Sequence, residues 1–172
     1  SQAFSDHALY LLHYRGYGGS SGSPSEEAIQ ADALALFDQV YAQHPCTVVV
    51  GRSLGSGVAV RLASQRPAAR LILITPYNSI QELAQSRFPY IPVQWLLKDK
   101  FESWKYAQQI RVPTLLIAAE QDQVIPRAST DALFSHFSLG VAALKVIPAA
   151  GHNSLSQRPE YLALLEGGLC KG

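Results

Sequence analysis

A serine in a glycine-bounded pentapeptide is the first candidate for chemistry in this 172-residue chain. The segment Gly51-Arg52-Ser53-Leu54-Gly55 has the form G-x-S-x-G and directly follows the apolar run Cys46–Val50. A β-branched run that ends in this pentapeptide and continues into a helical pattern is typical of a nucleophile elbow. Such an elbow is a tight strand-to-helix bend that exposes a serine hydroxyl at the carboxyl end of a parallel sheet. Both glycines are expected where neighbouring backbones come close and a Cβ would clash.

A serine hydroxyl is a weak nucleophile at neutral pH, so it needs an adjacent base, and that base needs a third group to orient it. Asp122 follows the strand pattern Thr114–Ala119, and His152 follows a further strand pattern, Leu144–Ile147. The order serine, acid, histidine is one of the known serine-hydrolase orders. Each candidate comes just after a predicted strand, where the ligand sites of open α/β sheets lie. The sequence therefore predicts Ser53 as nucleophile, His152 as general base and Asp122 as the orienting acid.

Each of these residues also has an ordinary structural interpretation. Ser53 fits any small residue in a strand-to-helix turn, and Asp122 is a favoured residue type for capping a helix that begins near Pro126. Glu120 is a second acid, two residues away. His152 is preferred as the base because it alone among the histidines lies in a glycine-preceded loop after a strand. The other histidines, expected to be structural or solvent-facing, are His7, His13, His44 and His136.

Length, composition and charge narrow the class of protein. A chain of 172 residues with 48% hydrophobic content can form a sizeable core, so residues 1–172 are predicted to form a single domain. The net charge is +1 and the charges are interspersed, which argues against binding to nucleic acid or to an anionic membrane surface. No apolar run is long enough to span a bilayer, and no signal peptide is visible. The glycine-rich segment 16–25 matches neither a P-loop nor a dinucleotide fingerprint.

The sulfur-containing residues bear on compartment and processing. The two cysteines, Cys46 and Cys170, do not constitute a disulfide framework and are compatible with a reducing compartment, so a cytoplasmic location is favoured. The chain contains no methionine and therefore does not begin at a natural translation start. It is interpreted as a processed form or a fragment, and a membrane anchor in any preceding sequence would change the location.

The site residues need a scaffold, and apolar periodicity predicts strands that alternate with helices. The predicted strands are residues 8–14, 46–50, 70–76, 114–119 and 144–147, and a closing helix is predicted at 160–169. The first helix is expected to begin at Ser23, which has capping-box spacing to Glu26, and to continue through an apolar stripe over residues 29–40. This alternation implies an α/β fold with a mostly parallel sheet covered on both faces.

The segment 77–110 differs from the rest in its aromatic side chains and in the prolines that interrupt its helical pattern, Pro89 and Pro92. Its aromatic residues are Tyr77, Phe88, Tyr90, Trp95, Phe101, Trp104 and Tyr106. Most of them are expected to pack in the core beneath short helices. The remainder are expected to belong to a small cap whose aromatic side chains line an apolar substrate cleft.

Further motifs join the elbow and are spread over nearly the whole chain. They are Tyr14-Arg15-Gly16-Tyr17-Gly18 with Pro24-Ser25-Glu26-Glu27, Phe88-Pro89-Tyr90-Ile91-Pro92, Asp122 with Val124 and Pro126, and Gly151-His152-Asn153. On these residues the chain resembles the serine hydrolases of the α/β-hydrolase fold, specifically the Bem46-like branch that includes acyl-protein thioesterases. The resemblance implies the same roles for Ser53, Asp122 and His152, with no cofactor and no metal. It also implies that the backbone N–H of Leu54 is one oxyanion-hole donor.

The family pattern includes a part that this chain lacks. In the fold it resembles, three more strands come first, and the third ends in a His-Gly motif whose loop supplies the second oxyanion donor. No His-Gly pair occurs in the sequence. A sheet truncated at the N-terminus would leave a gap between residues 8–14 and 46–50, unless these two segments pair or the missing part is supplied elsewhere. Loss of one oxyanion donor costs about a hundredfold or more in turnover, so reduced or absent activity is expected.

The residues and the resemblance together predict a serine hydrolase that cleaves a carboxylic ester or thioester through an acyl-enzyme. The alternatives are a prolyl-oligopeptidase-like peptidase and a non-catalytic binding module on the same fold. The expected partner is a small-molecule or acyl-protein ester or thioester, with no nucleic acid. Membrane association is expected only through preceding sequence, and the oligomeric state is left open.

Overall fold

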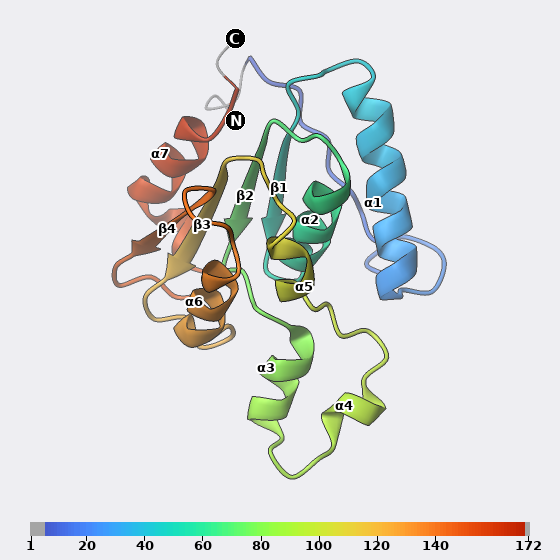
Figure 1. Ribbon diagram of the computed structural model, residues 1–172, viewed down its shortest axis with the longest axis vertical. Coiled ribbons are helices and arrows are strands. Elements are labelled where there is room, and N and C mark those ends of the chain that lie inside the picture. Colours follow the sequence, from blue (N-terminus) through green and yellow to red (C-terminus); the bar gives the residue numbers. More distant parts are fainter. Residues whose placement is uncertain (1–5, 171–172) are drawn as a thin grey trace.

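The computed structural model describes residues 6–170, in which four parallel strands form a sheet with helices on both faces (Figure 1). The strands are β1 (Val48–Arg52), β2 (Arg70–Ile74), β3 (Thr114–Ala119) and β4 (Ala142–Ile147). The helices are α1 (Glu26–Tyr41), α2 (Leu54–Gln65), α3 (Ile80–Arg87), α4 (Val93–Leu96), α5 (Trp104–Ala107), α6 (Arg127–Ser135) and α7 (Pro159–Gly167), with a 3-10 turn, η2 (Leu155–Gln157), before α7.

The strands lie in the order β1-β2-β3-β4, and every neighbouring pair is parallel. The register pairs the first residues of successive strands closely, with Val48 opposite Arg70 and Thr114 opposite Ala142. Because the strands are parallel and in register, their carboxyl ends meet at one edge of the sheet, which is the lower edge in Figure 1. The predicted α/β class with a parallel sheet is confirmed.

Side chains of the central strands alternate between two buried layers, as the pleat of a strand requires. Leu71 and Leu73 of β2 and Leu116 of β3 pack with α2, α5 and α6 on one face, and α1 packs against α2 on the same side. Ile72 and Ile117 pack with η2 and α7 on the other face. Burial on both faces explains why these strands appear in the sequence as continuous apolar runs.

The predicted first strand is wrong for the part of the chain that the structure describes. Residues 8–14 form no strand, and β1 is hydrogen-bonded to β2 alone among the described strands. Leu12 and Tyr14 pack against the cluster shared by α1 and α2, whereas Leu9 and Leu11 stay more than two-thirds exposed, at 74% and 71%. An apolar, β-favouring sequence forms a strand only where another strand pairs with it.

Several boundaries differ from the sequence expectation by a few residues. The N-cap of α1 is Ser25 and not Ser23, because the Ser25 hydroxyl accepts a hydrogen bond from the Ala28 N–H at 3.2 Å. The elbow strand begins at Val48, two residues later than expected. The closing helix begins at Pro159, a residue whose fixed φ and missing N–H suit the first helical position.

The cysteine interpretation is also wrong, because Cys46 and Cys170 form a disulfide. Cys46 precedes β1 and Cys170 follows α7, so the bond joins the segment entering the edge strand to the segment leaving the last helix. The two residues are 124 positions apart in sequence. Their pairing depends on this tertiary arrangement, since only cysteines with Cα atoms within about 7 Å can be bridged.

Residues 80–100 form an extension, here called the α3–α4 arm, that projects past the carboxyl ends of the strands (Figure 1). The arm is closed at its base, where the Ile80 N–H donates to the Lys100 carbonyl at 2.9 Å. No residue of α3 is buried, and in α4 only Val93 is. The arm therefore contributes little to the core.

The aromatic residues of segment 77–110 divide according to whether they lie beside or on this arm. Tyr77 and Phe101, next to its base, are buried as expected. Phe88, Tyr90 and Trp95, near its tip, are exposed. The expectation that most of these aromatics lie in the core is therefore wrong for the tip.

Candidate active site

Ser53 occupies the bend between β1 and α2 in a backbone conformation that side chains rarely adopt. Its φ is +49° and its ψ is −122°. Gly51 makes the bend possible, because a Cβ there would lie 2.5 Å from the Gly55 carbonyl oxygen and 2.6 Å from the Ala59 Cβ. A Cβ at Gly55 would meet the Tyr14 hydroxyl at 3.1 Å, a less severe contact. The local geometry matches a nucleophile elbow.

The structure brings the three predicted residues together from three different strand ends. The His152 Nε2 lies 3.1 Å from the Ser53 Oγ, and the His152 Nδ1 lies 2.8 Å from the Asp122 Oδ2. The side chain of His152 is 12% exposed and that of Asp122 is 3% exposed. Both distances are within hydrogen-bond range, so a continuous chain of hydrogen bonds runs from the acid to the serine.

The partners of Asp122 determine which nitrogen of His152 carries the proton. The Asp122 Oδ1 accepts the N–H groups of Val124 and Ile125 at 2.9 and 2.8 Å. The Oδ2, as a carboxylate oxygen, accepts from the His152 Nδ1. In neutral imidazole the other nitrogen is then an acceptor. The Nε2 lone pair is therefore directed at the Ser53 hydroxyl, as a general base requires.

The rival acid, Glu120, has a different partner. Its Oε2 accepts the Ala149 N–H at 2.8 Å, in the loop that leads to His152. Arg52, next to the serine, donates from Nη2 to the His152 carbonyl oxygen at 3.0 Å. Neither contact was predictable from the sequence, because both are with backbone atoms and carry no motif. The Arg52 contact holds the histidine loop near the elbow, and the Glu120 contact joins that loop to the end of β3.

The first turn of α2 lies at the serine. The predicted oxyanion donor, the Leu54 N–H, is the first of this helix, and first-turn N–H groups have no intrahelical acceptor. Tyr77 braces the same turn: its hydroxyl donates to the Leu54 carbonyl at 3.1 Å. A Cβ at Gly57 would lie 2.2 Å from that hydroxyl, so the helix and the tyrosine are in close contact. Burial raises the pKa of Tyr77.

A cavity of about 260 Å³ adjoins this edge of the sheet, between α3 and the loop that follows Asp122. Its apolar lining includes Ile80, Leu83 and Phe88 from the arm and Val124 from the acid loop. The cavity is open to solvent at the same end of the molecule as Ser53. It offers room for an apolar substituent of a substrate.

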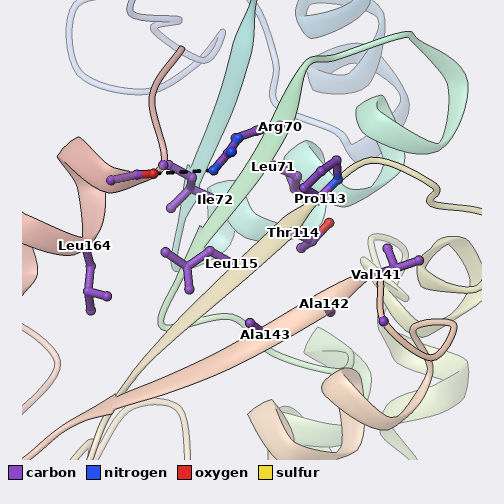
Figure 2. A pocket seen from close by; sticks show the side chains of 13 residues that line it. Arg70, Leu71, Ile72, Pro113, Thr114, Leu115, Val141, Ala142, Ala143 and Leu164 are labelled. Atoms are coloured by element: carbon purple, nitrogen blue, oxygen red, sulfur yellow. Dashed lines mark hydrogen bonds between the residues drawn. The ribbon is translucent and has the colours of Figure 1, made fainter. Parts of the chain in front are cut away.

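A larger cavity of about 420 Å³ lies at the opposite end of the sheet (Figure 2). Arg70, Thr114 and Ala142, the first residues of three strands, line it together with Leu164 of α7. Figure 2 also shows the hydrogen bond from Arg70 to the Gly167 carbonyl, 3.4 Å long. This cavity is separated from Ser53 by the length of the strands.

Three of the other histidines have contacts outside the site. His7 and His44 are exposed and contact the Cys170 carbonyl and the Tyr10 hydroxyl, and the ring of His136 lies beside that of Trp104. Within residues 6–170, no group of three or more His, Cys, Asp or Glu side chains could hold a metal ion. No helix in that range has both the length and the apolar character needed to cross a membrane.

Comparison with known proteins places the sequence in a family. The Hydrolase_4 family model, described as serine aminopeptidase S33, matches residues 3–110. The protein bem46 of Schizosaccharomyces pombe is 29% identical over 170 residues, which cover 91% of this chain and 56% of that protein. The chain belongs to the Bem46-like α/β hydrolases. The motif resemblance is thereby confirmed.

Two further proteins are similar to this Bem46-like hydrolase, one in sequence and one in fold. Lysophosphatidylserine lipase ABHD12 of Xenopus tropicalis is 37% identical over 133 residues, covering 66% of this chain and 34% of that protein. A structure of an α/β serine hydrolase homologue from Coxiella burnetii superposes with a TM-score of 0.66 at 20% identity, covering 91% of this chain and 66% of that one. The chain spans about half the length of several curated relatives, 47–56%, and 34% of the lipase.

Proposed function

We propose that this Bem46-like protein is a serine hydrolase that cleaves a carboxylic ester or thioester through an acyl-enzyme. The observation that carries the proposal is the pair of contacts at His152, 3.1 Å to the Ser53 Oγ and 2.8 Å to the Asp122 Oδ2. The similarity to a lysophosphatidylserine lipase supports an ester as substrate. Because residues 8–14 form no strand and only one oxyanion donor is assigned, we expect reduced turnover.

In the proposed mechanism, His152 Nε2 takes the hydroxyl proton while Ser53 Oγ attacks the acyl carbon. Asp122 accepts the Nδ1–H throughout and stabilises the imidazolium that forms. The Leu54 N–H, at the positive end of α2, donates to the developing oxyanion. The imidazolium then returns its proton to the departing alcohol or thiol. Water, deprotonated by the same nitrogen, hydrolyses the acyl-serine.

The first test is labelling with a fluorophosphonate probe, followed by intact-mass analysis. The parent protein should gain one adduct and Ser53→Ala none, because the probe bonds covalently to an activated serine. Asp122→Asn should slow labelling by roughly four orders of magnitude, since the amide favours the wrong imidazole tautomer. Glu120→Gln is the matched control and should label at nearly the parent rate. Equal labelling of Ser53→Ala would move the nucleophile elsewhere, and equal loss in both acid variants would contradict the assignment of Asp122.

A peptidase is the second candidate, favoured by the serine-aminopeptidase description of the matching family model. The two candidates differ in the bond that is cleaved. We expect turnover of p-nitrophenyl esters of short and medium acyl chains and none of aminoacyl p-nitroanilides. The opposite preference would favour the peptidase. A protein that neither turns over substrates nor labels would favour a non-catalytic binding module.

A further inference from the structure

The tip of the α3–α4 arm carries large apolar side chains that face solvent. The exposed fractions are 53% for Phe88, 99% for Tyr90, 43% for Ile91, 81% for Trp95 and 68% for Leu96. Single exposed apolar residues are ordinary, but a cluster within one short projecting segment marks an interaction surface. Tryptophan and tyrosine prefer the boundary between water and hydrocarbon, because their rings are apolar and carry one polar group.

The arm also concentrates unpartnered positive charge. Within residues 6–170, the Lys and Arg side chains that make no hydrogen bond, ion pair or ring contact are Arg87, Lys98, Lys100 and Lys145. Three of these four belong to the arm. Its two acids are engaged elsewhere: Glu82 accepts from the Asn78 Nδ2 at 2.7 Å, and Asp99 accepts from the Glu26 N–H at 2.7 Å. Both donors are uncharged, so the two carboxylates keep their charge, but they lie at the base of the arm. Between them, residues 83–98, which contain the apolar tip, carry two cations and no acid.

The base of the arm holds this tip in a defined position. The Lys100 carbonyl accepts from the Ile80 N–H at 2.9 Å, and the Phe101 N–H donates to the Glu26 Oε2 at 2.9 Å. These bonds tie the arm to the start of α1, and Figure 1 shows the tip projecting from the edge of the sheet where the strands end. Phe88 belongs both to the exposed tip and to the lining of the 260 Å³ cavity beside the acid loop. The exposed surface is therefore continuous with the cavity next to the candidate site.

We infer that the tip of the α3–α4 arm docks on a lipid surface with anionic headgroups. Trp95 and Leu96 enter the boundary between headgroups and acyl chains, and Arg87 and Lys98 contact the headgroup anions. The net charge of +1 for the whole chain gave no sign of this surface, because acidic residues elsewhere in the chain offset its cations. The inference goes beyond the proposed function, since docking requires no turnover at Ser53.

The test is sedimentation with vesicles, using the Ser53→Ala protein so that binding is separated from hydrolysis. The vesicles are phosphatidylcholine alone, or phosphatidylcholine with about one phosphatidylserine in three lipids. Binding to the anionic vesicles is expected, with much weaker binding to the neutral ones. In a Trp104→Phe background Trp95 is the remaining tryptophan, and its emission should shift to the blue on binding.

Charge variants with a matched control test the contribution of the arm. Arg87→Gln with Lys98→Gln should weaken binding about twenty-five-fold, from about fivefold for each charge near an anionic surface. Lys145→Gln removes the unpartnered cation of β4, outside the arm, and should leave binding unchanged. Trp95→Ser with Leu96→Ser should abolish the bound fraction, whereas Leu139→Ser, at a fully exposed leucine outside the arm, should not.

Three results would overturn the inference: no vesicle binding, equal binding to neutral and anionic vesicles, or equal losses in arm and control variants. The first result would indicate that the tip binds another protein and not a lipid surface. None of these results bears on fluorophosphonate labelling, so the docking inference and the proposed function fail separately. The arm variants and their controls lie on exposed side chains, whereas Ser53 and Trp104 are half-buried. Circular dichroism checks that every variant remains folded.

Discussion

The strained backbone of Ser53 leads to an unusual stability prediction: replacing this residue by glycine should give a more stable protein than replacing it by alanine. A φ of +49° with a ψ of −122° lies outside the regions that residues with a Cβ favour. Such strain costs about 1–3 kcal/mol, whereas glycine costs about 0.5–1 kcal/mol in unfolded-state entropy relative to alanine. The free energy of unfolding of Ser53→Gly should therefore exceed that of Ser53→Ala by about 0.5–2 kcal/mol.

Comparing these two variants isolates the backbone, because both lack the Oγ that contacts His152. Urea unfolding without reductant measures the difference, with the disulfide intact. Ser64, within α2, is the matched control: its hydroxyl donates to the Arg61 carbonyl at 2.7 Å, and both Ser64→Gly and Ser64→Ala remove that bond. Ser64 lies in the last turn of α2, where the glycine variant should be the less stable by up to about 1 kcal/mol.

The two positions should thus give differences of opposite sign. If the glycine variant is less stable than the alanine variant at both Ser53 and Ser64, the backbone strain ascribed to Ser53 is absent. The elbow geometry would then not restrict the residue type at position 53. A change in the urea m-value in any variant would indicate an altered denatured state and would disqualify that variant from the comparison.

Three further outcomes follow from features of the fold. Gly51→Ala should lower the free energy of unfolding by about 1–3 kcal/mol, because the added Cβ has no room. Gly167→Ala is the control and should have little effect, because a Cβ there meets nothing within 4 Å. Equal effects of the two substitutions in urea unfolding would contradict the packing at the elbow. Replacing both Cys46 and Cys170 by serine should cost about 2–5 kcal/mol, since the bond closes a long loop, and the parent protein with reductant should match the variant. The raised pKa of Tyr77 means that folding favours its protonated form, so the associated stability is complete below the unfolded-state pKa, near 10, and declines as pH rises above it. Tyr77→Phe should therefore show a shallower loss of stability than the parent between pH 10 and 12, and parallel curves would refute this.

The sequence predicted most of the scaffold because its information is local. Strand patterns at 70–76 and 114–119 were buried apolar runs next to turn residues, and such runs are recognisable without knowledge of their partners. The elbow was recognisable for the same reason, since the tight bend requires small residues at the ends of G-x-S-x-G and this requirement is local. The pattern at 8–14 was of equal quality but failed, because a strand exists only where another strand pairs with it.

The features that the sequence left open or missed depend on contacts between distant segments. The sequence favoured Asp122 as the acid but left Glu120 as a rival, and the two differ in the structure because one contacts His152 and the other contacts the Ala149 N–H. The disulfide depends on β1 and α7 bringing Cys46 and Cys170 together. Trp95 is exposed because the arm projects from the rest of the fold. Its hydrophobicity alone would have predicted burial.

The disulfide also sets how the molecule would respond to a mechanical load. It makes the chain from Cys46 to Cys170 a covalent ring, which contains the whole sheet and the three candidate catalytic residues. Tension applied at the chain ends passes through the bond between the sulfur atoms and bypasses the sheet. Stretching would then peel away α1 and the segment before it, adding about 160 Å of extended chain for the residues before Cys46. The further extension of roughly 430 Å from the 124-position separation would become accessible only after reduction, so a thiol would release the sheet to the pulling force.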